Sequence, residues 1–588
     1  MENIQDVVLT ALGKRSADLV IKNGVIVNTI TRETFEGGIA VTGKRIAAIG
    51  NVDYTVGDNT KVIDANGAYI VPGLIDGHVH VETSLLSYAR FAQAVMPHGT
   101  TAVMCDFHEV GIVSGVKGIK ATIDEANKTP LKLYFIVPVK IPFHPGLETT
   151  GGELGPEDVK ELLQIPNAVG LSEIVAMNVL MGDPSYLKAI EYAKNAKVTL
   201  EGHAPTLKDA MLSAYAVFGI RSDHESFTTE EAWQRIRNGI RLMMREGSVA
   251  KNLHETIKVI TEKKVDPRYA IMITDDVDAP DLLKDGHLDH LIRRAIEEGV
   301  DPITAIQMVT INTAENYRVD YEVGSLTPGR YADILLVDDL EKFNVKTVIA
   351  NGEMVAKDGK MVKDFPLPEH DPVLLNTVKL KKKIEPDDLK FRVEKSSGKV
   401  KLIVMKVPPT IPIVEHDEDV FEIKDGVVYP DPSRDLAQIS VIERHGKTGD
   451  VGSAFIRGFN LKEGAFASSM AHDNHNIVVL GTNLEDMAHA VNRVAELQGG
   501  QVVVKNGEIL AELSLPIAGL MSDEPPEVVA DKVEKLKEAT HKLGSTIYHP
   551  FMFLIFIPLA AIPLYAITDK GFVDVMKQKL ISPVIEYI

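Results

Sequence analysis

Eight short apolar runs recur along this chain, and a cluster of polar residues follows each run at once. Helix-length connections separate the runs. An alternation of strand-like runs with helical connections is typical of a parallel α/β barrel, whose functional side chains lie at the carboxyl ends of the strands. We therefore predict the α/β class and a (β/α)8 TIM-like barrel, with the polar clusters at one mouth. In chain order the clusters occupy residues 77–82, 106–109, 137–140, 172–173, 201–203, 223–225, 245–248 and 274–276.

The residues on both sides of this region read as short strands joined by tight turns. Asn-Gly is a strong signal for a two-residue hairpin turn. We expect one small β-sandwich domain built from both flanks, residues 1–75 and 322–375, around a barrel formed by residues 76–321. The turn pairs that support this expectation are Asn23-Gly24, Gly43-Lys44 and Asn351-Gly352.

A C-terminal α+β domain is expected over residues 401–588. Strand-like segments at 476–480 and 501–504 come before an amphipathic helix at 526–543. Residues 376–400 are dense in Lys, Glu and Asp, and we interpret them as a linker. The total of 588 residues fits a division into about three domains.

The charge balance and the termini limit the partners of this chain. A formal net charge of -20 argues against nucleic acid, because binding a phosphate backbone requires clustered cations. The most apolar stretch, residues 551–567, is interrupted by Pro558 and Pro563, so we expect buried core and no membrane partner. The N-terminus lacks a signal peptide pattern, and the single cysteine, Cys105, excludes an intrachain disulfide and is expected to be buried. We expect a cytoplasmic protein.

His78 and His80 are candidate metal ligands. Residues two apart in a strand point to the same side, so both imidazoles can bind one ion. The pair alone fits two hydrogen-bonded histidines equally well. However, other donors each end a separate run, and a barrel would bring them to the same mouth. These donors are Glu173, His203, His224 and Asp275.

The segment 73–80, followed by these spaced donors, resembles the amidohydrolase superfamily, and nearly the whole chain resembles its bacterial adenine deaminase family. The matches include segments 107–109, 202–205, 222–225 and 274–276, and they continue in the last domain at 471–476 and 516–522. The resemblance implies a metal-dependent hydrolase barrel with a binuclear divalent metal centre. Imidazole and carboxylate ligands without thiolate suit Mn, Fe and Zn. The resemblance favours Mn or Fe, and Zn is possible. One metal would be held by His78, His80, Glu173 and Asp275, and the other by Glu173, His203 and His224, with Glu173 as the bridge.

The same resemblance implies hydrolytic deamination of adenine to hypoxanthine and ammonia in purine salvage. A metal-bridging hydroxide would attack C6, and Asp275 would carry a proton to the departing amine. Glu109 or Glu82 would protonate the ring. Substrate binding is assigned to His108, Arg245 and Asp276. The expected partner is a small purine base, and the expected assembly is a homodimer or a larger homo-oligomer.

Several of these residues have a second reading. Glu82 and Asp276 can support a metal ligand by a hydrogen bond, and Arg245 can form an ion pair with Glu246. His287 and His290 are expected to be solvated. Met243 and Met244 are expected to fill the barrel. The cluster of His472, Asp473 and His475 can bind a third ion, or it can satisfy itself in a turn or a domain contact, which is the reading we favour.

Two departures from the family pattern bear on the substrate. Adenine deaminases usually read Arg-His-Pro after the Asp275-Asp276 pair, whereas this chain continues with residues 277–280 as Val-Asp-Ala-Pro. Residues 137–144 also replace a stretch rich in Ser, Cys and Thr. An N6-substituted adenine such as N6-methyladenine therefore stays an alternative substrate. A cyclic-amide hydrolase on the same metal centre is a further alternative, and a non-enzymatic binding or scaffold barrel is disfavoured because no metal donor is lost.

Overall fold

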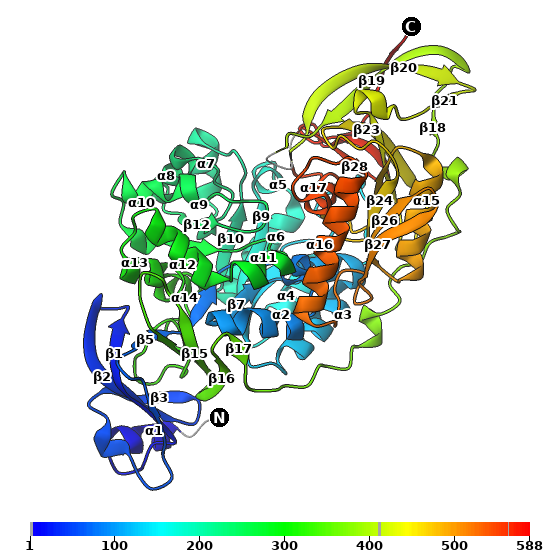
Figure 1. The fold of residues 1–588 in the computed structure, drawn as a ribbon. Coiled ribbons are helices and arrows are strands. Elements are labelled where there is room, and N and C mark those ends of the chain that lie inside the picture. Colours follow the sequence, from blue (N-terminus) through cyan, green and yellow to red (C-terminus); the bar gives the residue numbers. More distant parts are fainter. Residues whose placement is uncertain (1–3, 410–412, 563) are drawn as a thin grey trace.

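The computed structural model describes residues 4–409, 413–562 and 564–588, and its centre is a parallel barrel (Figure 1). Eight parallel strands follow one another around the sheet in chain order. A parallel bridge between Val79 and Asp275 joins the first strand to the last, so the ring closes. The predicted TIM-like barrel is confirmed. Its strands are β6 (Leu74–Asp76), β7 (Thr100–Cys105), β8 (Lys132–Pro138), β9 (Ala168–Val175), β10 (Thr199–His203), β11 (Ser222–Asp223), β12 (Arg241–Arg245) and β13 (Ala270–Ile273).

Helices connect the strands and begin at residues that suit helix starts. The helix α13 (Pro302–Met308) lies within the predicted span 302–310, and the Asp301 carboxylate caps its first turn. A capping box of Thr228 and Glu231 opens α8 (Thr229–Arg237). The other main connecting helices are α2 (Tyr88–Val95), α3 (His108–Ala126), α4 (Pro156–Leu162), α6 (Pro184–Ala196), α7 (Asp209–Ala216), α11 (Ala279–Lys284), α12 (Leu288–Glu297) and α14 (Ile311–Tyr317).

The barrel interior is filled by side chains from the strands. Met243 packs there with Ile136 and Ile271, whereas Met244 packs into the larger core outside the strands. Both methionines are fully buried, and the expected interior position is confirmed for Met243 alone. Cys105 is buried, as expected. The filled interior leaves the carboxyl ends of the strands as the place for a binding cavity.

A nine-stranded sheet is assembled from both flanks of the barrel. In it β5 (Tyr69–Pro72) pairs antiparallel with β14 (Ile334–Val337), across more than 250 residues of intervening barrel. The turn at Gly43-Lys44 joins β2 (Glu33–Thr42) to β3 (Arg45–Gly50). The turn at Asn351-Gly352 joins β15 (Val345–Ala350) to β16 (Glu353–Lys357). Other strands of this sheet are β1 (Leu19–Asn28), β4 (Lys61–Asp64) and β17 (Lys360–Met361).

The hairpin turn expected at Asn23-Gly24 is wrong. Strand β1 runs through both residues, and its register against β2 shifts there as a β-bulge. Asn23 takes a left-handed φ of 60°, and its side chain donates a hydrogen bond to Asp64. Asn tolerates this conformation better than most residues do. The Asn-Gly pair, which often forms a hairpin turn, therefore supplies the extra residue of a bulge within a strand. A Cβ atom at Gly24 would lie 2.7 Å from Ile70, which explains the glycine.

The C-terminal domain, yellow to red in Figure 1, packs against the barrel with an eleven-stranded sheet and helices. The strands β25 (Ile477–Gly481) and β26 (Gly500–Lys505) and the helix α16 (Pro526–Lys542) confirm the predicted elements. Strand β19 (Ser397–Lys406) begins inside the expected linker 376–400, so the end of that segment belongs to the sheet. The other strands of this sheet are β18 (Phe391–Arg392), β20 (Glu415–Lys424), β21 (Val427–Val428), β22 (Ala437–Ile442), β23 (Val451–Arg457), β24 (Ala465–Ser468), β27 (Glu508–Ser514) and β31 (Val584–Tyr587).

Most of the apolar stretch 551–567 is buried in this domain. It contains most of α17 (Pro550–Phe556) and the start of β28 (Tyr565–Thr568), and Leu554 and Ile557 are fully buried. The expected buried core is confirmed for most of the stretch, whereas Leu564 is exposed and lines the cavity described below, and Pro563 lies outside the described residues. Within the described ranges, every helix is too short or too polar to span a membrane.

Candidate metal centre

The structure brings the six predicted metal donors together at the carboxyl mouth of the barrel. They come from five different strand ends, and five of the six residues are buried while His203 is partly buried. His78 and His80 follow β6, which ends at Asp76. The remaining donors lie in or directly after later strands: Glu173 in β9, His203 in β10, His224 after β11 and Asp275 after β13.

Four of these side chains are spaced as they would be around one ion. The Nε2 atoms of His78 and His80 lie 3.2 Å apart. Asp275 Oδ1 lies 3.5 Å from Nε2 of His78 and 3.4 Å from Nε2 of His80. Glu173 Oε1 lies 3.5 Å and 3.7 Å from the same two atoms. Four tetrahedral donors with bonds of about 2.1 Å would lie about 3.4 Å apart, so the spacing fits a divalent ion.

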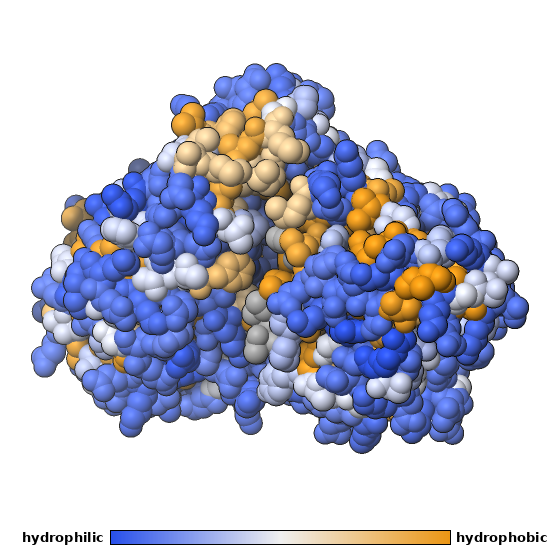
Figure 2. Space-filling view, turned by 90° about the horizontal axis from the view of Figure 1, so that it is seen from above, coloured by the Kyte–Doolittle hydropathy of each residue, from blue (hydrophilic) through white to orange (hydrophobic). Residues whose placement is uncertain are grey.

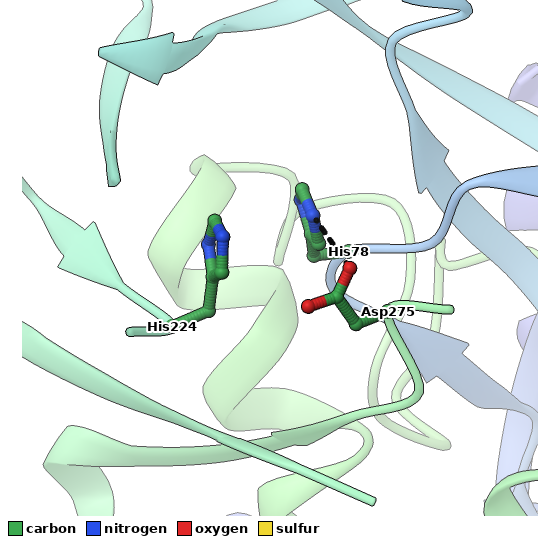
Figure 3. Close-up of side chains that lie close together, drawn as sticks. All are labelled: His78, His224 and Asp275. Carbon is green, nitrogen blue, oxygen red and sulfur yellow. Dashed lines mark ion pairs between the residues drawn. The ribbon is translucent and has the colours of Figure 1, made fainter. Parts of the chain in front are cut away.

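Glu173 is shared with a second group of donors. Its Oε2 atom lies 2.8 Å from Nδ1 of His203, and its Oε1 atom lies 3.7 Å from Nε2 of His224. Figure 3 shows the His224 ring beside His78, which is paired with Asp275, and the two imidazoles stack with centroids 4.4 Å apart. One carboxylate with two oxygens facing two histidine sets can bridge two ions.

The electrostatic setting keeps the carboxylates ionised. Burial raises the pKa of Glu173, but the imidazoles of His203, His224 and His78 outweigh burial and hold this pKa well below its usual range. Asp275 behaves alike: burial raises its pKa, whereas His78 and Arg245 lower it strongly. Both residues adopt a left-handed φ, 53° for Glu173 and 61° for Asp275. Backbone conformations of this kind gather at functional sites.

Two carboxylates behind the histidines were missed by the sequence reasoning. Glu201 Oε1 lies 2.7 Å from Nδ1 of His78, and the Tyr317 hydroxyl donates to Glu201 Oε2 at 2.9 Å. Asp106 lies 3.7 Å from Nδ1 of His80 and 2.9 Å from Nδ1 of His108. A carboxylate within hydrogen-bond distance of Nδ1, as Glu201 is for His78, favours the tautomer that leaves Nε2 free for a metal, whereas Asp106 lies too far from His80 Nδ1 to do so. The available signal was that both acids stand at barrel strand ends.

Arg245 contacts Glu225 and Asp275 rather than Glu246. Its guanidinium donates to both carboxylate oxygens of Glu225 and, at 3.0 Å, to Asp275 Oδ2. The alternative reading of Arg245, an ion pair with Glu246, is wrong, because Glu246 lies 3.9 Å from Arg294 instead. Arg245 therefore fixes the position of Asp275, one of the predicted metal donors.

A cavity of about 630 Å³ opens over the donors, and the C-terminal domain closes one side of it. Figure 2 shows a central hollow in the surface with apolar side chains along its rim. Of the predicted site residues, all but His78 and Glu82 line the cavity. The wall from the C-terminal domain includes Val414, His472, Asp473, Phe556, Leu559 and Leu564.

Glu82 and Glu109 have very different surroundings. Glu82 is fully buried, and burial together with the charges of Glu109 and Asp106 raises its pKa to about 7. Glu109 is also fully buried but faces imidazoles: His475 Nε2 contacts its Oε2, and His472 Nδ1 lies 2.9 Å from its Oε1. These imidazoles outweigh burial and keep the pKa of Glu109 well below its usual range. Glu109 is therefore ionised, and its carboxylate fixes the positions of the His472 and His475 imidazoles.

His287 is a further correction. It was expected to be solvated, but it is buried, with Nδ1 at 2.8 Å from Thr100 Oγ1 and Nε2 at 3.2 Å from Asp76. The Asp76 carboxylate also accepts hydrogen bonds from the backbone of His78 and from Thr274. This group joins the first and last strands of the barrel directly below the metal donors. His290 is partly buried.

Two family models match the chain, and together they cover the barrel and the last domain. Residues 69–355 match the Amidohydrolase family, and residues 413–579 match the Adenine deaminase C-terminal domain. An adenine deaminase of Clostridium botulinum (strain ATCC 19397 / Type A) is 41% identical over 585 residues, which is 98% of this chain and 96% of the relative. The chain belongs to the adenine deaminase family.

Other members of the adenine deaminase family match over the same extent. An adenine deaminase of Moorella thermoacetica is 41% identical, covering 99% of this chain and 98% of the relative. The adenine deaminase 1 of Desulfotalea psychrophila is 40% identical over the same shares. The two matched regions meet at the cavity: the amidohydrolase barrel supplies the metal donors, and the adenine deaminase C-terminal domain supplies the opposite wall.

Proposed function

We propose that this chain is a metal-dependent hydrolase that converts adenine to hypoxanthine and ammonia in purine salvage. The observation that carries the proposal is the set of six donors, spaced for two ions around the shared Glu173 carboxylate, at the floor of a cavity. Manganese or iron is the preferred metal for both positions, and zinc also suits the donors. When bound, two divalent ions would lower the pKa of water and supply the nucleophile.

Asp275 is suited to carry the proton that deamination requires. Its Oδ2 atom accepts a hydrogen bond from Arg245, which stabilises the ionised carboxylate. Its Oδ1 atom faces the histidine cage and lines the cavity. An ionised carboxylate at this position can take a proton from water and deliver it to the departing amine, which leaves poorly without it.

The cavity suits a free base. Its volume of about 630 Å³ holds a purine ring, and its lining combines apolar side chains with the polar and charged side chains of the barrel mouth. Among the lining residues that the structure describes, the basic ones besides histidines are Arg245 and Lys251, and Arg245 is already paired with two carboxylates. This setting favours a neutral base over a nucleotide, because a phosphate group would require free cations.

An N6-substituted adenine is a second candidate substrate. Of the two departures from the family pattern, the segment 277–280 lies outside the cavity lining, and Asp278 caps α11 instead. The other departure places Phe143 in the cavity wall, on the side of His108, with ring centroids 5.6 Å apart. An aromatic side chain at this position gives an apolar contact for a methyl group.

A substrate panel tests both candidates. Protein loaded with Mn or Fe is incubated with adenine, N6-methyladenine, adenosine, guanine and cytosine, and ammonia or methylamine is quantified. Hydantoin opening is measured beside them, with His78→Asn and Asp275→Asn as inactive controls. We expect amine release from adenine or its N6-methyl derivative. Opening of hydantoin without amine release from any purine would exclude the proposal and favour a cyclic-amide hydrolase.

A further inference from the structure

The loop 471–476 of the C-terminal domain reaches into the mouth of the barrel. The backbone N–H of His472 donates to the carbonyl of Ile555 at 2.9 Å, and its ring stacks on Phe556 with centroids 4.8 Å apart. The His472 side chain lines the cavity although it is only 4% exposed. Its position is thus fixed from behind by the C-terminal domain.

The hydrogen bonds of this loop argue against a third metal ion. Nδ1 of His475 accepts a hydrogen bond from the backbone N–H of Ala471 at 3.1 Å. A neutral His475 then carries its proton on Nε2, which faces Glu109. Because this nitrogen donates to the carboxylate, it has no lone pair for a cation. The loop is therefore a hydrogen-bonded contact between domains that holds His472 against Glu109.

Several buried polar atoms of the residues that line the cavity have no hydrogen-bond partner in the described part of the chain, and two of them belong to His472 and Asp276. Nε2 of His472 and Oδ1 of Asp276 are buried, and neither has a hydrogen bond within the described ranges 4–409, 413–562 and 564–588. They lie 4.0 Å apart, which is too far for a direct hydrogen bond. Buried polar groups in native proteins are nearly always paired, so unpaired ones in a cavity wall indicate a ligand.

We propose that His472 is a substrate-contacting residue, whose Nε2 atom hydrogen-bonds the heterocyclic ring of the substrate beside Asp276. The inference rests on the proposed function and adds a contact from the C-terminal domain to the barrel site. A flat ring with neighbouring acceptor and donor nitrogens, such as a purine, satisfies both wall atoms together. This contact gives the C-terminal domain a direct part in substrate recognition.

The charge of His472 agrees with this role. Burial lowers the pKa of its imidazole, but the Glu109 carboxylate outweighs burial and raises this pKa to about 9. Glu109 occupies Nδ1, so the second proton is on Nε2 and faces the cavity. A ring nitrogen with a lone pair is the matching acceptor, and the Asp276 carboxylate accepts from a neighbouring N–H.

Two substitutions of His472 separate substrate contact from a purely structural role. In His472→Asn the amide nitrogen takes the place of Nδ1, so the bond to Glu109 is kept and the cavity-facing atom is removed. In His472→Gln the amide nitrogen takes the place of Nε2, and the bond to Glu109 is lost. If His472 contacts the substrate, the Asn variant is the more impaired; if it only holds the domains together, the Gln variant is.

The test uses the full-length, Mn-loaded protein. We measure kcat/KM for adenine, the Kd of hypoxanthine by calorimetry, the metal content and Tm. For His472→Asn we expect kcat/KM to fall and Kd to rise by about 10- to 100-fold, with unchanged metal content, because a hydrogen bond to a charged group is lost. We expect His472→Gln to stay within about 10-fold of the wild type. His370→Gln is the control, since His370 contacts Asp523 of the C-terminal domain outside the cavity lining.

The outcomes separate this inference from the proposed function. Wild-type values for kcat/KM and hypoxanthine affinity in His472→Asn, in an active enzyme, would overturn the role of His472 alone. Greater impairment of His472→Gln than of His472→Asn would overturn it as well. A wild-type protein that released no amine from any purine would overturn the proposed function and this inference together.

Discussion

The Glu201 carboxylate lies 2.7 Å from Nδ1 of His78, on the side of the ring opposite the metal donors. Glu201 is fully buried, and the Tyr317 hydroxyl fixes its other oxygen. A carboxylate at this position favours the proton on Nδ1 and leaves Nε2 available for the proposed metal. The orientation of His78 thus depends on a residue more than a hundred positions away in the chain that is not one of the six candidate metal donors.

We expect Glu201→Gln to weaken metal binding about 10- to 100-fold, because the amide accepts the Nδ1 proton less well. Metal content after dialysis against graded chelator measures the effect. Glu246→Gln is the matched control, since Glu246 lies near Arg294 and outside the cavity lining. Equal metal retention by the two variants would refute the role of Glu201.

Removal of the Arg245 guanidinium should destabilise the protein strongly. Arg245→Met leaves Glu225 and Asp275 buried without their cation, and breaking a buried pair in this way costs about 3–5 kcal/mol. Urea unfolding of the metal-free protein measures the loss. Arg434→Met removes an exposed arginine that pairs with Asp431 and Asp419 near the surface, and it should change the free energy of unfolding by less than about 1 kcal/mol. Similar losses in both variants would contradict the prediction.

His370 predicts a pH-dependent stability. Hydrogen bonds to Asp523 and Glu125 raise its pKa to about 9, although burial opposes them. The unfolded value is about 6.5, so the folded state holds the proton more tightly. The stabilisation is complete below pH 6.5 or so and is lost as the pH rises through about 9.

The wild type should therefore exceed His370→Gln in unfolding free energy by about 2 kcal/mol at pH 6, with the difference vanishing near pH 10. This difference is smaller than the pKa shift of His370 alone would give, because the imidazole is only partly shielded from water. Urea unfolding at several pH values measures the difference. A gap that stays constant across this range would exclude the titration of His370 as its cause.

The barrel and the grouping of the candidate metal donors at its mouth could be predicted, because both follow from local sequence patterns. Each apolar run ends at its polar cluster, and parallel strands place their carboxyl ends at one mouth. Asn351-Gly352 forms the expected turn, but Asn23-Gly24 forms a bulge. A left-handed Asn suits both structures, so the pairing of the neighbouring strands determines which of the two forms. The local sequence carries no information about that choice.

The contacts that complete the site could not be predicted, because they join residues far apart in the chain. Glu109 and His475 are separated by 366 positions, and nothing in either segment indicates that the two side chains meet. The local sequence around His287 suggests an exposed helix residue, yet its ring is buried and contacts Thr100 and Asp76. Roles that depend on tertiary neighbours, such as those of Glu109 and His472, become visible only in the folded chain.

The shared position of Glu173 makes a sharp prediction about metal stoichiometry. Glu173 faces both histidine groups, whereas His203 faces only the second. Glu173→Gln should therefore lose both ions, and His203→Asn should keep about one of two ions per chain, held by the cage around His78. Elemental analysis after gel filtration measures the content. The exposed His254 supplies the control, because His254→Asn should keep the wild-type content. Retention of one ion by Glu173→Gln would show that the two groups bind independently, and the bridging role of Glu173 would then fail.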